Sequence, residues 1–153
     1  MKLKTIEDLD VSGKVVLVRC DFNVPIDEDG EISDASRIER HAPTIITLVN
    51  KGAKVALLSH FGRPAGKVDE NLSLGFISES LTETFKAPEI VVIPDCIGDV
   101  TKQVLKDMPD GQIALLENVR FYEGEENNDD DFSKSLADIA DIYVNDAFSV
   151  CHR

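Results

Sequence analysis

Five short aliphatic runs, each as long as one β-strand, constrain the fold of this 153-residue chain more than any other feature. They occupy residues 14–19, 54–59, 90–93, 112–116 and 141–144, each with a glycine, a proline or an acidic residue at its boundary. The first two runs, KVVLVR and KVALLS, are almost continuously apolar, which is typical of strands buried on both faces of a parallel sheet. The sequence therefore predicts five strands.

Helical patterns separate these runs. They cover residues 37–50, 73–85, 99–106 and 131–140. In the second pattern, Phe76 lies on the same predicted face as Leu81 and Phe85. Strands that alternate with helices form right-handed βαβ units. We therefore predict an α/β fold of three layers, a parallel sheet with helices on both faces, in one domain without internal repeats.

Composition excludes several classes of partner. A formal net charge of −13 repels nucleic acid and acidic membrane surfaces, although it does not exclude a small anion. The N-terminus meets acidic residues before any apolar segment, and no apolar run is long enough to span a membrane. The three cysteines (Cys20, Cys96 and Cys151) are far apart in the sequence, which fits a reducing compartment. We predict a soluble, cytoplasmic protein.

Arginines are concentrated where the strands end. Ligands of open parallel sheets bind beyond the carboxyl ends of the strands. Four of the six arginines lie in the segments where predicted strands end, and Arg37 opens the next helix; the four are Arg19, Arg63, Arg120 and Arg153. Because arginine binds phosphate and carboxylate groups in a bidentate manner, the set predicts an oxyanion site. For any one arginine, pairing with Asp21, Asp146 or Glu117 to fix a loop remains an open alternative.

Other polar motifs predict no metal or nucleotide site. Residues 62–68 are one residue short of a phosphate-binding P-loop, and Val68 stands where a hydroxyl would bind Mg²⁺. Residues 27–31 lack the spacing of a calcium loop. No cysteine or carboxylate is suitably spaced to complete a zinc site with His41, His60 or His152. We interpret the acidic run 123–131 as a solvated loop that leads into a helix.

Five segments together carry a resemblance to a known family. They are VRCDFNVP (18–25), DASRI (34–38), SHFGRP (59–64), LLENVRFYEGEE (115–126) and NDAFSVCHR (145–153). In this order the sequence resembles the N-terminal part of phosphoglycerate kinase. The family usually has NDAFGTAHR in the last segment, so Ser149 and Cys151 replace small residues there. The chain stops inside this motif, and we expect a fragment: the substrate-binding lobe, residues 1–153, without the C-terminal lobe.

The resemblance implies a function for the complete enzyme. Phosphoglycerate kinases of glycolysis transfer a phosphoryl group reversibly between 1,3-bisphosphoglycerate and ADP, giving 3-phosphoglycerate and ATP. Their N-terminal lobe binds the phosphoglycerate, their C-terminal lobe binds Mg-ATP or Mg-ADP, and the family is usually monomeric. We therefore expect this chain to lack turnover alone and to bind no cofactor. The alternative is a stand-alone small-anion-binding or receiver-like regulatory domain; the receiver-like form predicts an acidic pocket with a lysine on the last strand.

The resemblance also implies roles for individual residues. Asp21 and Asn23 match residues that bind the glycerate hydroxyl and carboxylate groups. The residues that match those binding the non-transferred phosphate in the family are His60, Arg63, Arg120 and Arg153. Arg37 matches the catalytic arginine placed against the transferring group, and Arg19 is expected to complete the cluster. The same motifs bring Phe22, Phe61 and Gly62 into the predicted substrate site. His60 either closes a strand or, as we prefer, donates a hydrogen bond to the anion.

Overall fold

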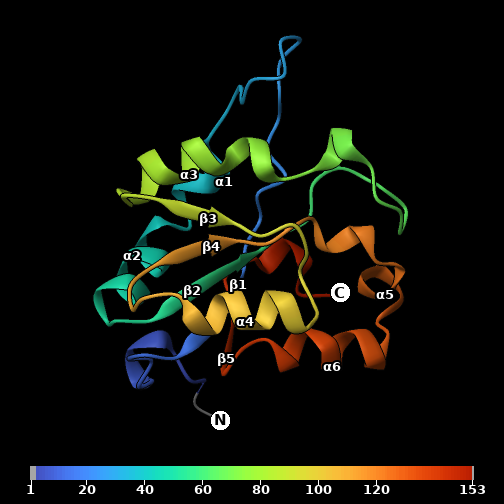
Figure 1. Cartoon of the computed structure of the whole chain (residues 1–153). Helices are drawn as coiled ribbons and strands as arrows, with labels where there is room; N and C mark the ends of the chain where they lie inside the picture. The colour runs from blue at the N-terminus through green and yellow to red at the C-terminus, as the bar shows by residue number, and fades with distance from the viewer. Residues whose placement is uncertain (1–2, 153) are drawn as a thin grey trace.

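The computed structural model describes residues 3–152 and contains one five-stranded parallel sheet (Figure 1). Its strands are β1 (Val15–Arg19), β2 (Lys54–Leu58), β3 (Ile90–Val92), β4 (Ile113–Leu115) and β5 (Ile142–Asn145). They lie in the order β3-β4-β2-β1-β5, and every neighbouring pair is parallel. The predicted parallel sheet is confirmed.

Helices cover both faces of the sheet, as predicted (Figure 1). One face carries α1 (Ser36–Glu39), α2 (Ala42–Asn50) and α3 (Ser78–Phe85). The opposite face carries α4 (Asp99–Asp107) and α6 (Asp130–Asp138). A short helix, α5 (Glu123–Asn127), precedes α6, and 3-10 turns occupy Ile6–Asp8, Glu70–Leu72, Gly75–Ile77, Val119–Phe121 and Phe148–Val150.

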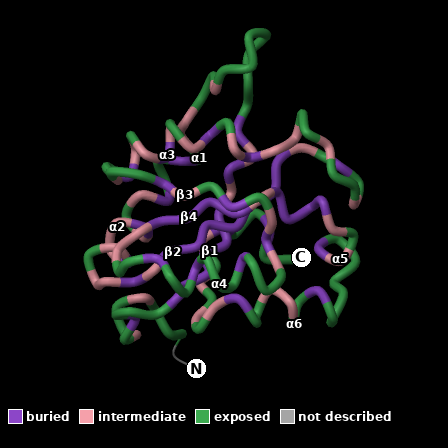
Figure 2. The backbone as a smooth tube through the Cα atoms, viewed as in Figure 1, coloured by how far each residue is buried: buried purple, intermediate pink, exposed green. Residues whose placement is uncertain are grey.

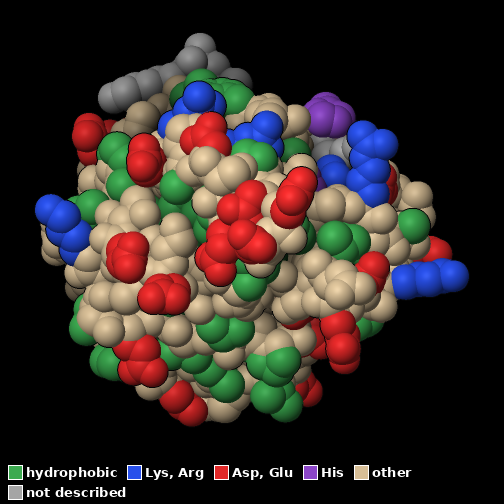
Figure 3. All heavy atoms as spheres, turned by 90° about the horizontal axis from the view of Figure 1, so that it is seen from above, with side chains coloured by type: hydrophobic (Ala, Val, Ile, Leu, Met, Phe, Trp, Pro, Cys, Tyr) green, Lys and Arg blue, Asp and Glu red, His purple; other side chains and the backbone are tan. Residues whose placement is uncertain are grey.

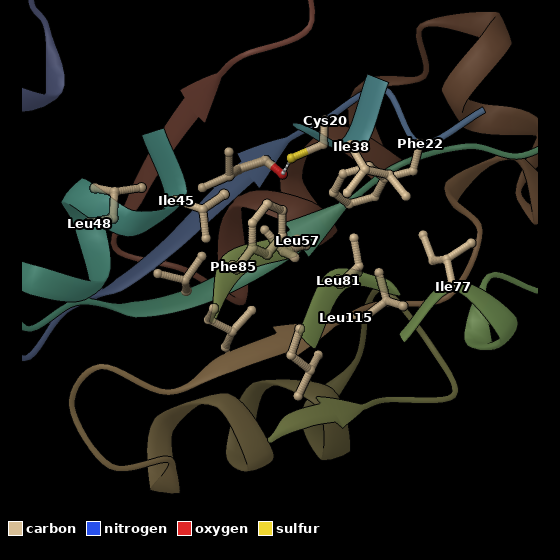
Figure 4. Close-up of a cluster of buried hydrophobic side chains, with 14 of the residues drawn as sticks. Cys20, Phe22, Ile38, Ile45, Leu48, Leu57, Ile77, Leu81, Phe85 and Leu115 are labelled. Carbon is tan, nitrogen blue, oxygen red and sulfur yellow. Dashed lines mark hydrogen bonds between the residues drawn. The ribbon is translucent and has the colours of Figure 1, made fainter. Parts of the chain in front are cut away.

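Alternation along the strands divides the core into two layers. Val16 and Val18 of β1 belong to the cluster under α1, α2 and α3, whereas Val15 and Leu17 belong to the cluster under α4 and α6. Successive strand residues point to opposite faces, so a strand buried on both faces is apolar throughout. The central strands β1, β2 and β4 are buried, whereas the edge strands β3 and β5 are partly exposed (Figure 2). Figure 4 shows the first of these clusters. No helix within residues 3–152 combines the length and apolar character needed to cross a membrane.

Three predictions of secondary structure are wrong in detail. Residues 37–50 form two helices, because the chain leaves helical hydrogen bonding around Arg40 and His41 before α2 begins with Pro43 in its first turn. Proline lacks an N–H donor and its ring clashes with the preceding turn, so it starts a helix more readily than it continues one. Residues 73–77 are not α-helical: a 3-10 turn precedes α3, which leaves Phe76 42% exposed. The acidic run contains α5, where a loop is predicted.

The strand register brings the polar segments to one edge. Arg19 pairs with Leu58 of β2 and with Asn145 of β5, so β1, β2 and β5 end at the same level. The backbone N–H of Cys20 then donates to the Leu58 carbonyl (2.8 Å), and that of Asp146 donates to the Arg19 carbonyl (3.0 Å). The segments after these strands therefore leave the sheet side by side.

Candidate anion-binding site

A cavity of about 340 Å³ lies where these segments meet. The predicted site residues that line it are Asp21, Asn23, Arg37, His60, Gly62, Arg63 and Arg120. The cavity is also lined by Ser149, Val150 and His152, which were not predicted as site residues. Residues from the ends of β1, β2, β4 and β5 thus converge as the arginine pattern predicts.

Four predicted residues are not part of this lining. Arg153 lies outside the described residues. Phe22 is completely buried in the cluster under α1 (Figure 4), with its ring edge-on to His41 at a centroid distance of 5.4 Å. Phe61 is 6% exposed and packs on Phe76, and Arg19 is buried on the other side of the sheet edge. Phe22, Phe61 and Arg19 are thus buried beside the cavity instead of lining it.

The first wall joins the loops after β1 and β2. The Gly62 N–H donates to Oδ1 of Asn23 at 3.0 Å, which leaves the Asn23 amide nitrogen as the group that can donate to a ligand. Gly62 has φ of +64°, and a Cβ there would lie 2.7 Å from Cδ2 of Leu72. Only glycine adopts this backbone without strain, so the residue type is required by the turn.

Asp21 and Arg37 form the second wall. Arg37 Nη1 donates to the Asn23 carbonyl at 2.6 Å and lies 3.5 Å from Oδ1 of Asp21. The side chain of Arg37 remains 45% exposed, so most of its guanidinium is available to a ligand. Ser149 Oγ donates to the other Asp21 oxygen at 3.0 Å. A serine at this position, which the family usually fills with glycine, therefore contacts the carboxylate directly.

His41 links Asp21 to Asp146 through two hydrogen bonds. The backbone N–H of Asp21 donates to Nε2 of His41 at 2.9 Å, while Nδ1 of His41 lies 2.7 Å from Oδ2 of Asp146. An N–H group only donates, so Nε2 carries the lone pair and Nδ1 carries the proton that goes to Asp146. Thr44 donates to the second Asp146 oxygen at 3.1 Å. The end of β5 is thereby tied to the loop after β1.

Asn118 anchors the third wall. Its amide nitrogen donates to the carbonyls of Phe61 (2.7 Å) and Leu72 (3.0 Å), and its Oδ1 accepts from the N–H of Arg120 (3.1 Å). The residue is 1% exposed. Because one buried side chain fixes both the loop after β2 and the turn that carries Arg120, the positions of the two loops depend on each other.

Glu125 is buried, although the sequence predicts that it is solvated. It lies within the acidic run interpreted as solvated, yet it is 8% exposed. Its Oε2 accepts from Nε of Arg120 at 2.9 Å, and its Oε1 accepts from Nη2 of Arg19 at 3.2 Å. The terminal nitrogens of Arg120 remain available to the cavity. The open alternative of arginine–acid pairing is therefore correct for Arg19 and in part for Arg120, with an acid that was not considered. It is also correct in part for Arg37, which pairs with Asp21 as that alternative allowed.

His60 is neutral in the folded chain. Burial, followed by the nearby cations Arg120 and Arg19, lowers its pKa from 6.5 to about 4. Nη2 of Arg19 lies 3.2 Å from Nδ1 of His60. An uncharged imidazole still donates one hydrogen bond, so His60 can contact an anion without being protonated.

Positive charge is local on a surface that is acidic overall. A histidine side chain lies beside Lys or Arg side chains at one margin of the face in Figure 3, whereas acidic side chains are spread over much of the rest. Ionic screening acts over about 8 Å at physiological salt, so neighbouring arginines dominate the field inside the cavity. Within residues 3–152 no three His, Cys, Asp or Glu side chains are grouped as metal ligands.

The fold and the cavity define an α/β domain with an arginine-lined cavity, a candidate anion-binding site, at the carboxyl edge of a parallel sheet. The family model for phosphoglycerate kinase matches residues 6–153. The chain belongs to the phosphoglycerate kinase family.

Individual relatives agree with this assignment. The chain is 53% identical over 156 residues to the phosphoglycerate kinase of Trichodesmium erythraeum, covering 100% of this chain and 39% of the relative. It is 54% identical to that of Rhizobium johnstonii, covering 98% and 37%. The crystal structure of the Pyrococcus horikoshii enzyme superposes with a TM-score of 0.86 at 31% identity, covering 99% of this chain and 38% of that one. The chain thus spans less than two fifths of the length of these relatives.

Proposed function

We propose that this chain is the N-terminal lobe of a phosphoglycerate kinase and binds 3-phosphoglycerate or 1,3-bisphosphoglycerate in the cavity at the sheet edge. The observation that carries the proposal is the convergence of Arg37, Arg63 and Arg120 with His60 on one cavity in a chain of net charge −13. Family membership and the share of each relative that is matched support it.

In this proposal the cavity walls bind different parts of the substrate. Arg63, Arg120 and His60 hold the non-transferred phosphate, with Arg153 as a further expected contact. Asp21 accepts from the glycerate hydroxyl and the Asn23 amide donates to the carboxylate, because these are the acceptor and donor that the two side chains have available. Hydrogen bonds to charged groups contribute about 1.5–3 kcal/mol each, so a few suffice for a small dianion.

Arg37 is proposed as the catalytic residue of this lobe. Its bond to the Asn23 carbonyl holds the stem in place while the rest of the guanidinium stays accessible. An arginine that neutralises charge developing on a transferring phosphoryl group contributes roughly 10³–10⁵ in rate. In the complete enzyme, the Mg-ATP or Mg-ADP that exchanges this group is proposed to bind to the other lobe.

The proposal is tested by an amide NMR titration of the 153-residue chain with 3-phosphoglycerate. We expect saturable shifts at residues 21–23, 37, 60–63 and 120. Arg63→Ala should weaken binding about tenfold or more, from the loss of one charged hydrogen bond. Arg40→Ala is the matched control, because Arg40 is exposed and does not line the cavity. Equal affinities of both variants and the parent chain would reject the assigned cavity.

A turnover assay tests the proposed division between lobes. The chain alone should form no ATP from 1,3-bisphosphoglycerate and ADP, and robust ATP formation would contradict the proposal. The receiver-like alternative requires a lysine on the last strand, whereas β5 reads Ile-Tyr-Val-Asn. A monomeric state remains a prediction from the resemblance, and a cytoplasmic location remains a prediction from the sequence.

A further inference from the structure

Arg19 lies behind the proposed phosphate site instead of within it. It is the last residue of β1, and its side chain shares the sheet face of Val15 and Leu17, towards α6. Its side chain is 7% exposed, contacts Glu125 and His60, and is absent from the cavity lining. Arg19 therefore acts on the cavity through other residues: through His60 directly and through Arg120 by way of Glu125.

The contact between Arg19 and His60 fixes the proton on the imidazole. A guanidinium has no acceptor, so Nη2 of Arg19 must donate across the 3.2 Å to Nδ1 of His60. Nδ1 then carries the lone pair, and the proton of the neutral ring lies on Nε2. Since Nδ1 is occupied, Nε2–H is the donor that His60 can offer to a ligand in the cavity.

Glu125 keeps Arg19 in this arrangement. Its carboxylate joins Nη2 of Arg19 to Nε of Arg120, so it holds both of the arginines that act on His60. Nε of Arg19 is buried without a hydrogen-bond partner within residues 3–152. A buried donor without a partner destabilises the folded state, so stability alone does not explain an arginine at this position.

The charges around His60 also favour its neutral form. Arg19 and Arg120 face the ring as cations, whereas Asp21 and Glu125 face it as anions. Burial and the two arginines have the larger effect and lower the pKa of His60 to about 4. The imidazole therefore stays neutral across the pH range in which free histidine changes charge.

We propose that Glu125 and Arg19 act as positioning residues that lock His60 as the neutral Nε2–H tautomer, giving the site an anion donor whose state does not change between about pH 5 and 8. The inference deepens the proposed function and rests on it for the identity of the anion. The tautomer itself is a property of the ligand-free chain.

The first experiment reads the tautomer directly from long-range ¹H–¹⁵N NMR of the histidine rings between about pH 5 and 8. His60 should show a protonated Nε2 and an unprotonated Nδ1 throughout. His41 is the internal control, because its contacts require the opposite tautomer, protonated at Nδ1. A His60 ring that titrates within this range, or that carries its proton on Nδ1, would overturn the proposal.

Variants then test whether Arg19 and Glu125 position the His60 ring or only stabilise the fold. Arg19→Met keeps an unbranched side chain but removes the donor, so His60 should become a mixture of tautomers and its pKa should rise. Glu125→Gln should also give a mixture of tautomers, because Arg19 loses its carboxylate partner. The His60 pKa should not rise as it does in Arg19→Met, because the Glu125 carboxylate itself raises that pKa. Arg40→Met is the exposed control. An unchanged His60 spectrum in Arg19→Met would reject the role of Arg19. The tautomer measured in the parent chain decides the proposal even if this variant is unstable.

Binding completes the test with sulfate, which remains a dianion throughout the range. Because His152 also lines the cavity, the titrations use the His152→Gln background. Affinity should vary less than about twofold between about pH 5 and 8, and Arg19→Met should make it decline as pH rises. A locked His60 with no binding of 3-phosphoglycerate would reject the proposed function alone. Binding of 3-phosphoglycerate with an unlocked His60 would reject this inference alone.

Discussion

Replacement of Asn118 by alanine should destabilise the chain and loosen two walls of the cavity together. The side chain is 1% exposed and makes three hydrogen bonds, to the Phe61 and Leu72 carbonyls and from the Arg120 N–H. Each is worth about 1 kcal/mol net, so we expect a loss of about 3 kcal/mol in the free energy of unfolding. For a domain of this size that corresponds to a fall of roughly 6–12 °C in Tm.

Urea unfolding followed by circular dichroism measures this loss. Asn127→Ala is the control, because Asn127 is exposed in α5 and its replacement should change stability by no more than about 0.5 kcal/mol. Amide spectra of Asn118→Ala should also show changes at both Gly62 and Arg120, which the side chain joins. A loss below about 1 kcal/mol, or changes at only one loop, would refute the reasoning that Asn118 couples the loops.

Further predictions concern the core, the thiols and pH. Phe22→Ala should cost about 3–5 kcal/mol in urea unfolding because the ring is fully buried, whereas Phe76→Ala should cost much less; equal losses would contradict the core assignment. A thiol reagent should label exposed Cys151 well before Cys96, whose pKa burial raises to about 12. The pKa of His60 falls from 6.5 to about 4 on folding, so the unfolded chain binds more protons between these values and stability should rise with pH there. His60→Gln should reduce that rise, and an unchanged pH slope would argue against the lowered pKa.

The sheet could be predicted because its signal is local. A run such as KVVLVR is apolar on both faces only if both faces are covered, and covered faces require helices on each side. The break before α2 is less visible, because Pro43 is compatible both with a kink in one helix and with the start of another. Phe76 has the spacing of a helical face, but the 3-10 turn at Gly75–Ile77 rotates it outward. Tertiary packing decides such details.

The convergence of the arginines could also be predicted, since strand ends in a parallel sheet meet at one edge. That rule alone does not predict which arginines line the cavity and which are buried behind it. Arg63 follows β2 in an exposed turn and lines the cavity, whereas Arg19 ends β1 and is buried. Alternation from Leu17 was the available signal: it assigns Arg19 to the same sheet face, away from the ligand.

The pairing of Glu125 with Arg19 and Arg120 could not be predicted from the sequence. Glu125 lies in a run of acidic and amide residues, 123–131, and nothing local distinguishes it from exposed Glu126. Only the packing of α5 against the Val119–Phe121 turn sends this one carboxylate between Arg120 and Arg19. Removing one partner of a buried ion pair typically costs about 3–5 kcal/mol, whereas changing a solvated acid costs little. The energetic importance of an acidic residue here therefore follows from the topology that buries it.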